Sequence, residues 1–405
     1  MPSGPLVPIR RAPTATDKYI AGAKYCAGTA YRFVQVDRLT SNQRSELGGV
    51  DADPDIYAVL IPADGSTNTA KAIDRDTALL YLTLREPGPL PSFMRTTLGD
   101  DLPATVRRLV LDGILEIFDG GEFVSGPRAG MLLGTCPGSA PTRGRLAQLS
   151  VDALRYAQNL QIDDARVLAL RLYCYNRRPI TPAWARRLPT RAATADYLGV
   201  TKGETGPAPG PGWTSLMGPD VDDEHWLAWR SRVPTDPSGE HITYKLYVSP
   251  LPSAVPDALR ISAEVLHELR APAFKVGADL HGLLRPDKLV AYFTGFEQLA
   301  AAAAHLQDRL AGLPAHGVPF TAEISTDGLL SWGVDPPRRE RGLTWIGDSW
   351  RLWVAGQLAA GLLAARSATD EEPWRYALER IRLEGLDPET WIPKQTLFAP
   401  TPGGA

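Results

Sequence analysis

The chain has 405 residues, of which 44% are hydrophobic and 22% are charged, and its formal net charge is -3. This composition is typical of a globular protein that is long enough for two or three domains. A net charge so close to zero gives no general attraction for polyanions. Nucleic acid is therefore not expected as a partner, and any phosphate site must be local.

Cysteine usage and hydropathy exclude two further classes of protein. The three cysteines, Cys26, Cys136 and Cys174, are far apart and odd in number, which fits neither a disulfide framework nor a metal-binding cluster. Residues 1–11 lack an apolar core of signal-peptide length, and the Ala/Leu-rich run 352–365 is too short to span a bilayer. We expect a cytoplasmic protein without membrane segment, metal or cofactor.

Helices followed by a hairpin are predicted in the N-terminal part, which we take as residues 1–135. The predicted elements are helices 78–84, 91–98 and 102–115 and strands 114–118 and 122–125. Asp119-Gly120-Gly121 is a strong turn signal between the two strands. The order is that of a winged helix. Only Arg107 and Arg108 offer cations on the third helix, so we expect a peptide-docking or scaffolding module and not a DNA-binding one.

This block resembles the small winged-helix domains that bind precursor leader peptides in pathways for ribosomally made, post-translationally modified peptides. In such domains an extended peptide adds a strand to a sheet edge. The resemblance implies docking on the strands before the helices, around Tyr57–Pro62. A purely structural wing without ligand is the alternative.

Residues 136–200 are predicted to form a helical segment that ends in a polar-aromatic cluster over 171–178. Such a cluster can bind an anionic or peptide ligand, although an amphipathic helix end that packs its tyrosines is the more common explanation. The Pro/Gly-rich stretch 201–213 is typical of a linker. It predicts a boundary before a C-terminal domain, residues 214–405.

Two strand-like segments of this domain each carry one lysine among apolar residues: Lys245 in 244–249 and Lys275 in 273–277. The amphipathic helix predicted over 256–269 separates them, so both lysines could face one cleft. A neighbouring cation and partial desolvation both lower a lysine pKa toward a value useful for proton abstraction. The alternative is that both lysines lie at strand ends or on a solvated face and extend into water.

A third strand candidate, 288–293, follows with Arg285 and Lys288 at its start. Arginine presents a planar fork that binds phosphate or carboxylate in a bidentate way. With the lysines, this predicts removal of a proton next to a carbonyl, with phosphate as leaving group. The elements that complete an α+β domain are helix 296–313, strands 318–324 and 329–335, and helices 349–366 and 373–384.

The C-terminal half resembles the phosphothreonine lyase group, and within it the HopA-type effector family, whose relatives serve as lyases in class V lanthipeptide and thioamitide pathways. The matching pieces are Tyr-Lys-Leu-Tyr-Val-Ser (244–249), Ala-Pro-Ala-Phe-Lys-Val (271–276), Pro-Asp-Lys-Leu-Val-Ala-Tyr-Phe (286–293), Val-Pro-Phe-Thr (318–321) and Gly-Leu-Asp-Pro (385–388). They fall within about the last 180 residues. Lyase domains of class III lanthipeptide synthetases share the first two, typically with histidine where this chain has Tyr247.

Carried over by position, the resemblance implies that Lys275 removes the α-proton of a phosphothreonine or phosphoserine residue and that Lys245 stabilises the enolate-like charge. Tyr247 would protonate the leaving phosphate or hydrogen-bond to it. A phenol is a weaker acid than imidazolium at neutral pH, so cations must neutralise the phosphate. The candidates for that role are Arg285, Lys288, Arg230, Arg232 and Arg351.

We therefore expect a phosphothreonine or phosphoserine lyase that forms dehydrobutyrine or dehydroalanine in a precursor peptide, in lanthipeptide-type maturation. The chain contains no phosphate-binding loop and no kinase motif set, so a separate kinase is implied as a partner. The alternative is a non-catalytic partner that keeps a lyase-like fold to bind a peptide or a kinase. A type III effector role is less favoured, because the N-terminal half reads as folded.

Overall fold

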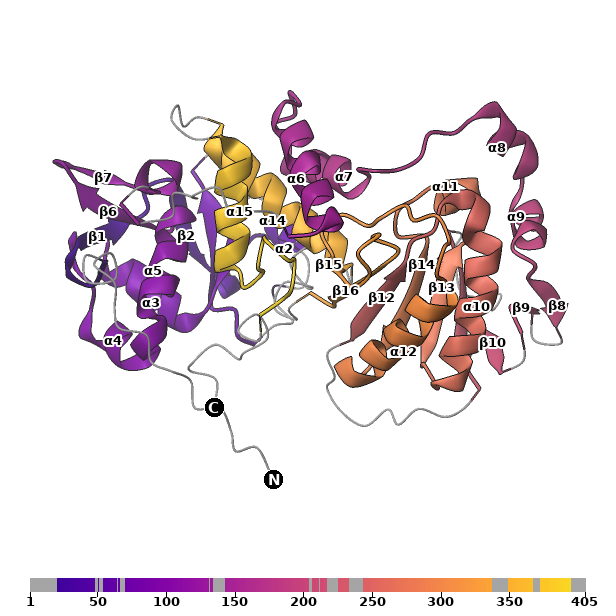
Figure 1. The fold of residues 1–405 in the computed structure, drawn as a ribbon. Coiled ribbons are helices and arrows are strands. Elements are labelled where there is room, and N and C mark those ends of the chain that lie inside the picture. The colour runs from indigo at the N-terminus through magenta and orange to yellow at the C-terminus, as the bar shows by residue number, and fades with distance from the viewer. Residues whose placement is uncertain are drawn as a thin grey trace. The chain divides into compact units, whose positions relative to one another are not determined.

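The structure is a computed structural model of the chain. It describes residues 20–47, 50, 54–63, 65, 70–130, 132–133, 143–203, 206–210, 212–216, 225–232, 243–336, 349–366 and 372–394. These residues belong to two compact units, one made of 1–138, 364–384 and 399–405 and the other of 139–363 and 385–398 (Figure 1). Both units mix helices with largely antiparallel strands, which confirms the predicted α+β class.

The division between the units lies near residue 138 and not in the Pro/Gly-rich stretch 201–213. Parts of that stretch form a two-stranded ribbon of β8 (Thr201–Gly203) and β9 (Gly206–Ala208). Trp213 then begins a strand of the large sheet of the second unit. The whole stretch belongs to one unit, so the predicted linker does not separate compact parts. The helical segment predicted before it belongs to the second unit from residue 139 onward.

The first unit contains two small sheets and the predicted helices. The strands are β1 (Lys24–Ala27), β5 (Gly88–Pro89), β6 (Leu115–Asp119) and β7 (Glu122–Val124), in the order β5-β1-β6-β7, and β2 (Tyr31–Gln35), β3 (Ala58–Pro62) and β4 (Lys71–Ile73), in the order β2-β3-β4. The helices are α2 (Ser41–Leu47), α3 (Arg75–Thr83), α4 (Ser92–Leu98) and α5 (Leu102–Leu111). Three helices and a hairpin thus occur in the predicted order.

Strand β3 lies in the middle of its sheet. Ala58–Leu60 pairs with β2 on one side and with β4 on the other, so its backbone groups are used in both directions. Strand addition needs an unpaired edge. The prediction that a peptide adds a strand at 57–62 is therefore wrong.

A helix from the far end of the sequence completes the first unit. Helix α15 (Pro373–Leu383) packs on α5, and the Tyr376 hydroxyl donates to the last carbonyl of α5 at 2.9 Å. Arg380 pairs with Asp112, which also lies 3.4 Å from the Lys71 ammonium. Burial alone would raise the pKa of Asp112, but Arg380 and Lys71 lower it below its usual range. The carboxylate stays charged and ties three elements together.

The second unit is built on a seven-stranded antiparallel sheet. Its strands follow the order β10 (Trp213–Ser215), β11 (Trp226–Ser231), β13 (Ala273–Gly277), β14 (Leu289–Phe293), β12 (Tyr244–Val248), β16 (Leu330–Val334) and β15 (Ala322–Glu323). Its helices are α6 (Arg145–Gln158), α7 (Ala165–Tyr173), α8 (Pro182–Arg187), α9 (Arg191–Tyr197), α10 (Val255–Glu268), α11 (Leu280–Leu283), α12 (Phe296–Arg309) and α14 (Trp350–Ala365), whose last two residues belong to the first unit. No helix in the described part of the chain is long and apolar enough to cross a membrane.

Helices α10 and α12 cover one face of this sheet (Figure 1). Every second residue of the strands points into the core between the sheet and these two helices. Leu246, Phe274 and Ala291 are three such residues, and all are completely buried. Because side chains along a strand alternate between faces, the residues next to these point to the opposite face. Lys245, Tyr247 and Lys275 are such residues, so the hydrophobic packing of α10 and α12 fixes the direction of both lysines.

The start of α14 packs on the sheet at Gly333 of β16. A Cβ atom at this position would lie less than 3.0 Å from atoms of the Trp350 ring, so only glycine leaves room for the indole. Trp350 is completely buried and is followed directly by Arg351. The contact therefore determines where this arginine enters the structure.

Replacing Gly333 by alanine should destabilise the second unit by about 1–3 kcal/mol, because the added methyl group overpacks the Trp350 ring. All but one of the ten tryptophans lie in this unit, so urea unfolding followed by tryptophan fluorescence measures the change. Gly295→Ser is the control, since a Cβ there meets nothing within 4 Å and serine suits the helix N-cap. Equal stability of both variants would contradict the role of Gly333.

Candidate functional site

Strand register brings the two predicted lysines and Tyr247 to one face of the sheet. Lys275 of β13 and Tyr247 of β12 pair with Val290 of β14 from opposite sides, and Lys245 pairs with Tyr292 one step further along. Cross-strand partners share a face, and strands are about 4.8 Å apart, so the backbones of Lys275 and Tyr247 are roughly 10 Å apart. Lys245 is only 5% exposed and Lys275 is half-buried, so neither lies on a solvated face.

Lys245 is committed to a carboxylate. Its ammonium nitrogen lies 2.6 Å from Oδ1 of Asp335, which follows β16, and both side chains are buried. An ammonium in a buried ion pair has no lone pair with which to accept a proton. Lys245 is therefore a fixed positive charge and not a base.

Lys275 lies among aromatic rings. Its nitrogen is 4.3 Å from the centre of the Trp226 ring and 5.7 Å from that of Tyr292. The guanidinium carbon of Arg285 lies 4.9 Å from the same Trp226 ring. The Trp226 ring thus contacts the charged groups of both Lys275 and Arg285, which places these two cations close to each other. Trp226 defines a part of the site where a lysine and an arginine meet.

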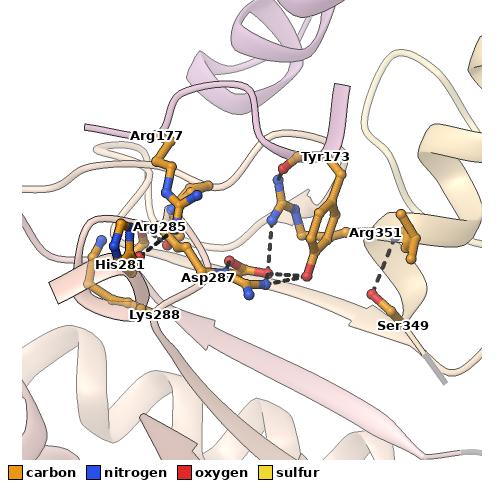
Figure 2. Close-up of polar contacts among 12 residues, drawn as sticks. Tyr173, Arg177, His281, Arg285, Asp287, Lys288, Ser349 and Arg351 are labelled. Carbon is orange, nitrogen blue, oxygen red and sulfur yellow. Dashed lines mark hydrogen bonds and ion pairs between the residues drawn. The ribbon is translucent and has the colours of Figure 1, made fainter. Parts of the chain in front are cut away.

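A buried carboxylate, Asp287, holds the guanidinium groups of Arg285 and Arg351 (Figure 2). Arg285 donates from Nε to Oδ1 at 2.9 Å and from Nη2 to Oδ2 at 3.0 Å, and Nη1 of Arg351 lies 2.9 Å from Oδ2. Burial alone would raise the pKa of Asp287, but the two guanidiniums hold it far below its usual range. The carboxylate is therefore charged at neutral pH, and the three groups together carry one positive charge.

Tyr173, the last residue of α7, closes this cluster (Figure 2). Its hydroxyl donates to Asp287 at 3.2 Å and accepts from Nη2 of Arg285, and its carbonyl oxygen accepts from Nη2 of Arg351 at 2.9 Å. The ring centre lies 5.2 Å from the Arg285 guanidinium carbon and 4.8 Å from that of Arg351. Burial raises the pKa of Tyr173, so the phenol stays protonated. The predicted polar-aromatic cluster thus contributes to the site through one tyrosine that packs on arginines.

Two predicted phosphate ligands are buried, and their side-chain nitrogens already contact protein acceptors. Lys288 is completely buried, and its nitrogen lies 2.9 Å from the Pro250 carbonyl oxygen and 2.8 Å from Nδ1 of His316. Arg351 is 1% exposed, with Nε on the Pro319 carbonyl oxygen and both Nη atoms engaged by Asp287 and Tyr173. A phosphate could reach either only by displacing these partners, so the direct contacts predicted for Lys288 and Arg351 are not supported.

Arg285 is partly exposed, unlike Lys288 and Arg351. Its side chain is 21% exposed, and its Nη1 makes no hydrogen bond to any residue that the structure describes. Arg230 and Arg232 are exposed; Arg230 pairs with Ala273, in the same cross-strand row as Tyr292, and Arg232 follows the end of β11. Neither side chain contacts the cluster in the described part of the structure, and their role stays a prediction.

Tyr247 lies between these groups and presents an uncommitted hydroxyl. The side chain is 4% exposed and packs on Val290 and Val318. Burial raises its pKa well above the usual value, although the nearby Arg351 charge acts in the opposite direction. Within the described ranges its hydroxyl forms no hydrogen bond. Tyr247 is therefore a protonated phenol whose hydroxyl is not committed to another residue in the described ranges.

Four residues of the site were not predicted from sequence: Asp287, Asp335, Trp226 and Tyr292. Asp287 stands inside one of the matching pieces, directly before Lys288, so its position was visible but its partner was not. Tyr292 stands in the same piece, but its place beside Lys245 follows from the pairing of β14 with β12, which is not encoded locally. In the described residues no group of three or more His, Cys, Asp or Glu side chains could hold a metal ion.

Replacing Asp287 by asparagine should destabilise the second unit by about 3–5 kcal/mol at pH 7, because two buried guanidiniums lose their counter-ion. The pKa of Asp287 is lower in the folded state than in the unfolded state. Its contribution to the free energy of unfolding is therefore present above the unfolded pKa near 3.9 and is lost as the pH falls below that value. The difference from wild type should narrow below that pH. Urea unfolding at pH 7 and pH 3.5 measures the stability difference from wild type at each pH, with the exposed Asp308→Asn as control. The same difference at both pH values would contradict the role of Asp287 as a charged counter-ion.

Comparison with solved structures finds effector proteins and phosphothreonine lyases. An effector protein from Pseudomonas syringae pv. syringae strain 61 is 13% identical, with 62% of this chain and 99% of that chain covered and a TM-score of 0.38. One from Pseudomonas syringae pv. tomato strain DC3000 is 14% identical, with 62% and 98% covered and a TM-score of 0.39. The phosphothreonine lyase SpvC, an effector protein from Salmonella, is 14% identical, with 45% and 90% covered and a TM-score of 0.27. No family model and no curated protein matches the chain.

Proposed function

We propose that the chain eliminates phosphate from phosphothreonine or phosphoserine residues of a peptide. The observation that carries the proposal is the arrangement of Lys275, ion-paired Lys245 and the uncommitted Tyr247 hydroxyl on one sheet face, with partly exposed Arg285 beside them. These are the four groups that such an elimination needs: a base, a fixed positive charge, a proton donor and an anion ligand.

The two lysines take different roles because of their surroundings. Lys275 removes the α-proton in its uncharged amine form, and the electron pair of the Cα–H bond forms the Cα=Cβ bond while the Cβ–O bond to phosphate breaks. Lys245, held by Asp335 at 2.6 Å, stays charged and faces the negative charge that develops on the substrate carbonyl oxygen. The products are a dehydroamino acid residue and inorganic phosphate, and the proton ends on Lys275.

Arg285 and Tyr247 act on the leaving group. Arg285 offers Nη1 to the phosphate while Asp287 and Tyr173 fix the rest of its guanidinium. A phosphate dianion would leave as a trianion, which is a strong enough base to take a proton from a phenol. The raised pKa of Tyr247 keeps that proton in place until the Cβ–O bond breaks. Before the next turnover the phenolate takes up a proton from water, and Lys275 releases the one that it gained.

The biological setting that we propose is maturation of a ribosomally made peptide of the lanthipeptide type. The substrate would be a precursor peptide phosphorylated by a separate kinase, because the chain has no kinase motif set. The helices and hairpin of the first unit are proposed to hold the precursor. Docking cannot use the middle strand β3, which leaves the edges of the small sheets or the helix surfaces.

Replacing Lys275 by alanine should lower the rate of phosphate elimination by about 10²–10⁴-fold, because the base is lost. Mass spectrometry of a phosphothreonine peptide after incubation detects loss of phosphoric acid. The control is Lys394→Ala, which removes an exposed lysine of the same unit. Peptide affinity, measured by fluorescence anisotropy, should stay nearly unchanged in both variants. Full activity of Lys275→Ala would remove this residue from the mechanism.

Replacing Tyr247 by phenylalanine tests the proton donor and the alternative function together. The variant keeps the buried ring and removes only the hydroxyl, so a fall in rate with unchanged stability assigns the proton to Tyr247. Unchanged turnover would show that the phosphate leaves without this acid. If wild type itself binds the phosphopeptide but releases no phosphate in the presence of the kinase, the chain is the non-catalytic peptide-binding partner instead.

A further inference from the structure

Lys288 and His316 form a buried pair that the proposed reaction does not use. The Lys288 nitrogen donates to the Pro250 carbonyl oxygen at 2.9 Å and lies 2.8 Å from Nδ1 of the imidazole. Nε2 of the same ring lies 2.6 Å from the carbonyl oxygen of Asn176. Lys288 is completely buried and His316 is 3% exposed. The pair thus joins the chain after α7, at Asn176, to the chain after β12, at Pro250, in a buried place.

The hydrogen-bond partners determine the protonation of both groups. A backbone carbonyl only accepts, so Nε2 of His316 must carry a hydrogen toward Asn176, and a neutral ring then presents a lone pair at Nδ1. An uncharged amine has two N–H donors, and the described structure offers Lys288 two acceptors, Pro250 and Nδ1. An ammonium would bury a third donor without a partner. The geometry matches an uncharged amine bonded to an uncharged imidazole.

The charged neighbours agree with this reading. Burial lowers the pKa of Lys288 well below its usual value, and Arg178 adds to the effect while Asp287 opposes it. Burial is the largest cause that lowers the pKa of His316, and the charges of Arg178 and Arg351 act in the same direction, against the backbone hydrogen bond to Asn176.

The pair holds the end of α7. The Asn176 side-chain amide donates to the Gly317 carbonyl oxygen at 2.9 Å, and the backbone carbonyl oxygen of Asn176 accepts from His316, so this residue is bound to the 316–317 loop in both directions. Asn176 has a positive φ of 65°, a conformation that asparagine tolerates where the chain leaves a helix. Tyr173, which packs on Arg285 and Arg351, stands only three residues earlier.

We propose that Lys288 and His316 are positioning residues, an uncharged amine bonded to an uncharged imidazole, which hold the end of α7 and thereby Tyr173 against the arginine pair of the site. The effect on catalysis rests on the function proposed above, whereas the charge state and the anchoring of α7 do not. Lys288 is thus a structural support for the anion site and not one of its ligands.

The charge state is tested by the pH dependence of folding in the full-length protein. If Lys288 is uncharged when folded, it takes up a proton on unfolding below about pH 10.4, so the folding constant rises by a further factor of about ten per pH unit above the folded-state pKa. Urea unfolding by tryptophan fluorescence between pH 7.5 and 9.5 should show this extra slope in wild type and in Lys394→Met, and its absence in Lys288→Met. Equal slopes in all three would overturn the proposal.

The anchoring of α7 is tested with variants of His316. This test does not depend on whether Lys288→Met folds. Glutamine keeps an amide N–H for the Asn176 carbonyl, whereas alanine does not. Hydrogen exchange of residues 173–178 should quicken at least several-fold in His316→Ala and stay near wild type in His316→Gln. In the phosphopeptide assay, His316→Ala should raise KM with a smaller change in kcat, and His316→Gln should restore it.

The outcomes separate the two proposals. Unchanged exchange at 173–178 in His316→Ala would overturn the anchoring role, whatever the activity. Wild type that releases no phosphate, but shows the extra slope and the faster exchange in His316→Ala, would refute the lyase function and leave the positioning pair intact. Equal KM for wild type and His316→Ala in an active enzyme would refute the link to the site.

Discussion

The carboxylate of Asp287 is the charge on which the candidate site depends. Two guanidiniums within a few ångströms of each other in a buried place would repel strongly without a shared counter-ion. Asp287 accepts from Arg285 through both oxygens and pairs with Arg351, and Tyr173 completes the set with its hydroxyl. The carboxylate therefore allows positive charge to be concentrated beside Lys275 in a folded protein.

The balance of charge on this sheet face suits a phosphate monoester. Four cations, Lys245, Lys275, Arg285 and Arg351, face two anions, Asp287 and Asp335. The excess is two positive charges with Lys275 protonated and one when it is ready to act as a base. A phosphate monoester carries about -1.5 to -2 at pH 7, so binding of the proposed substrate would nearly neutralise the site.

The sequence predicted the helices and strands and the common sheet face of the two lysines. It did not predict which of the neighbouring cations are buried and which are exposed. The spacing of apolar residues located α10 and the lysine-bearing strands, because each of these elements buries regularly spaced apolar side chains in the same core. Arg285, Lys288 and Arg351 look alike in sequence, yet one reaches the surface, one is an uncharged support and one is a buried strut. Their difference comes from β14 packing next to β12 and from Trp350 lying on Gly333, both contacts between residues far apart in the chain. The Pro/Gly-rich stretch misled for the opposite reason: its turn chemistry is local, whereas a domain boundary is not.

The insertion of the second unit within the first governs when each can be finished during synthesis. Residues 139–363 form nearly all of the second unit, so its sheet and its site can assemble while the ribosome is still making the rest. The first unit has to wait, because Asp112 acquires its partner Arg380 only after more than 260 further residues have been made. Until then α5 lacks the helix that covers it, and a buried carboxylate lacks its arginine. The N-terminal part is thus made first and completed last, and it is the part most in need of protection as the chain emerges.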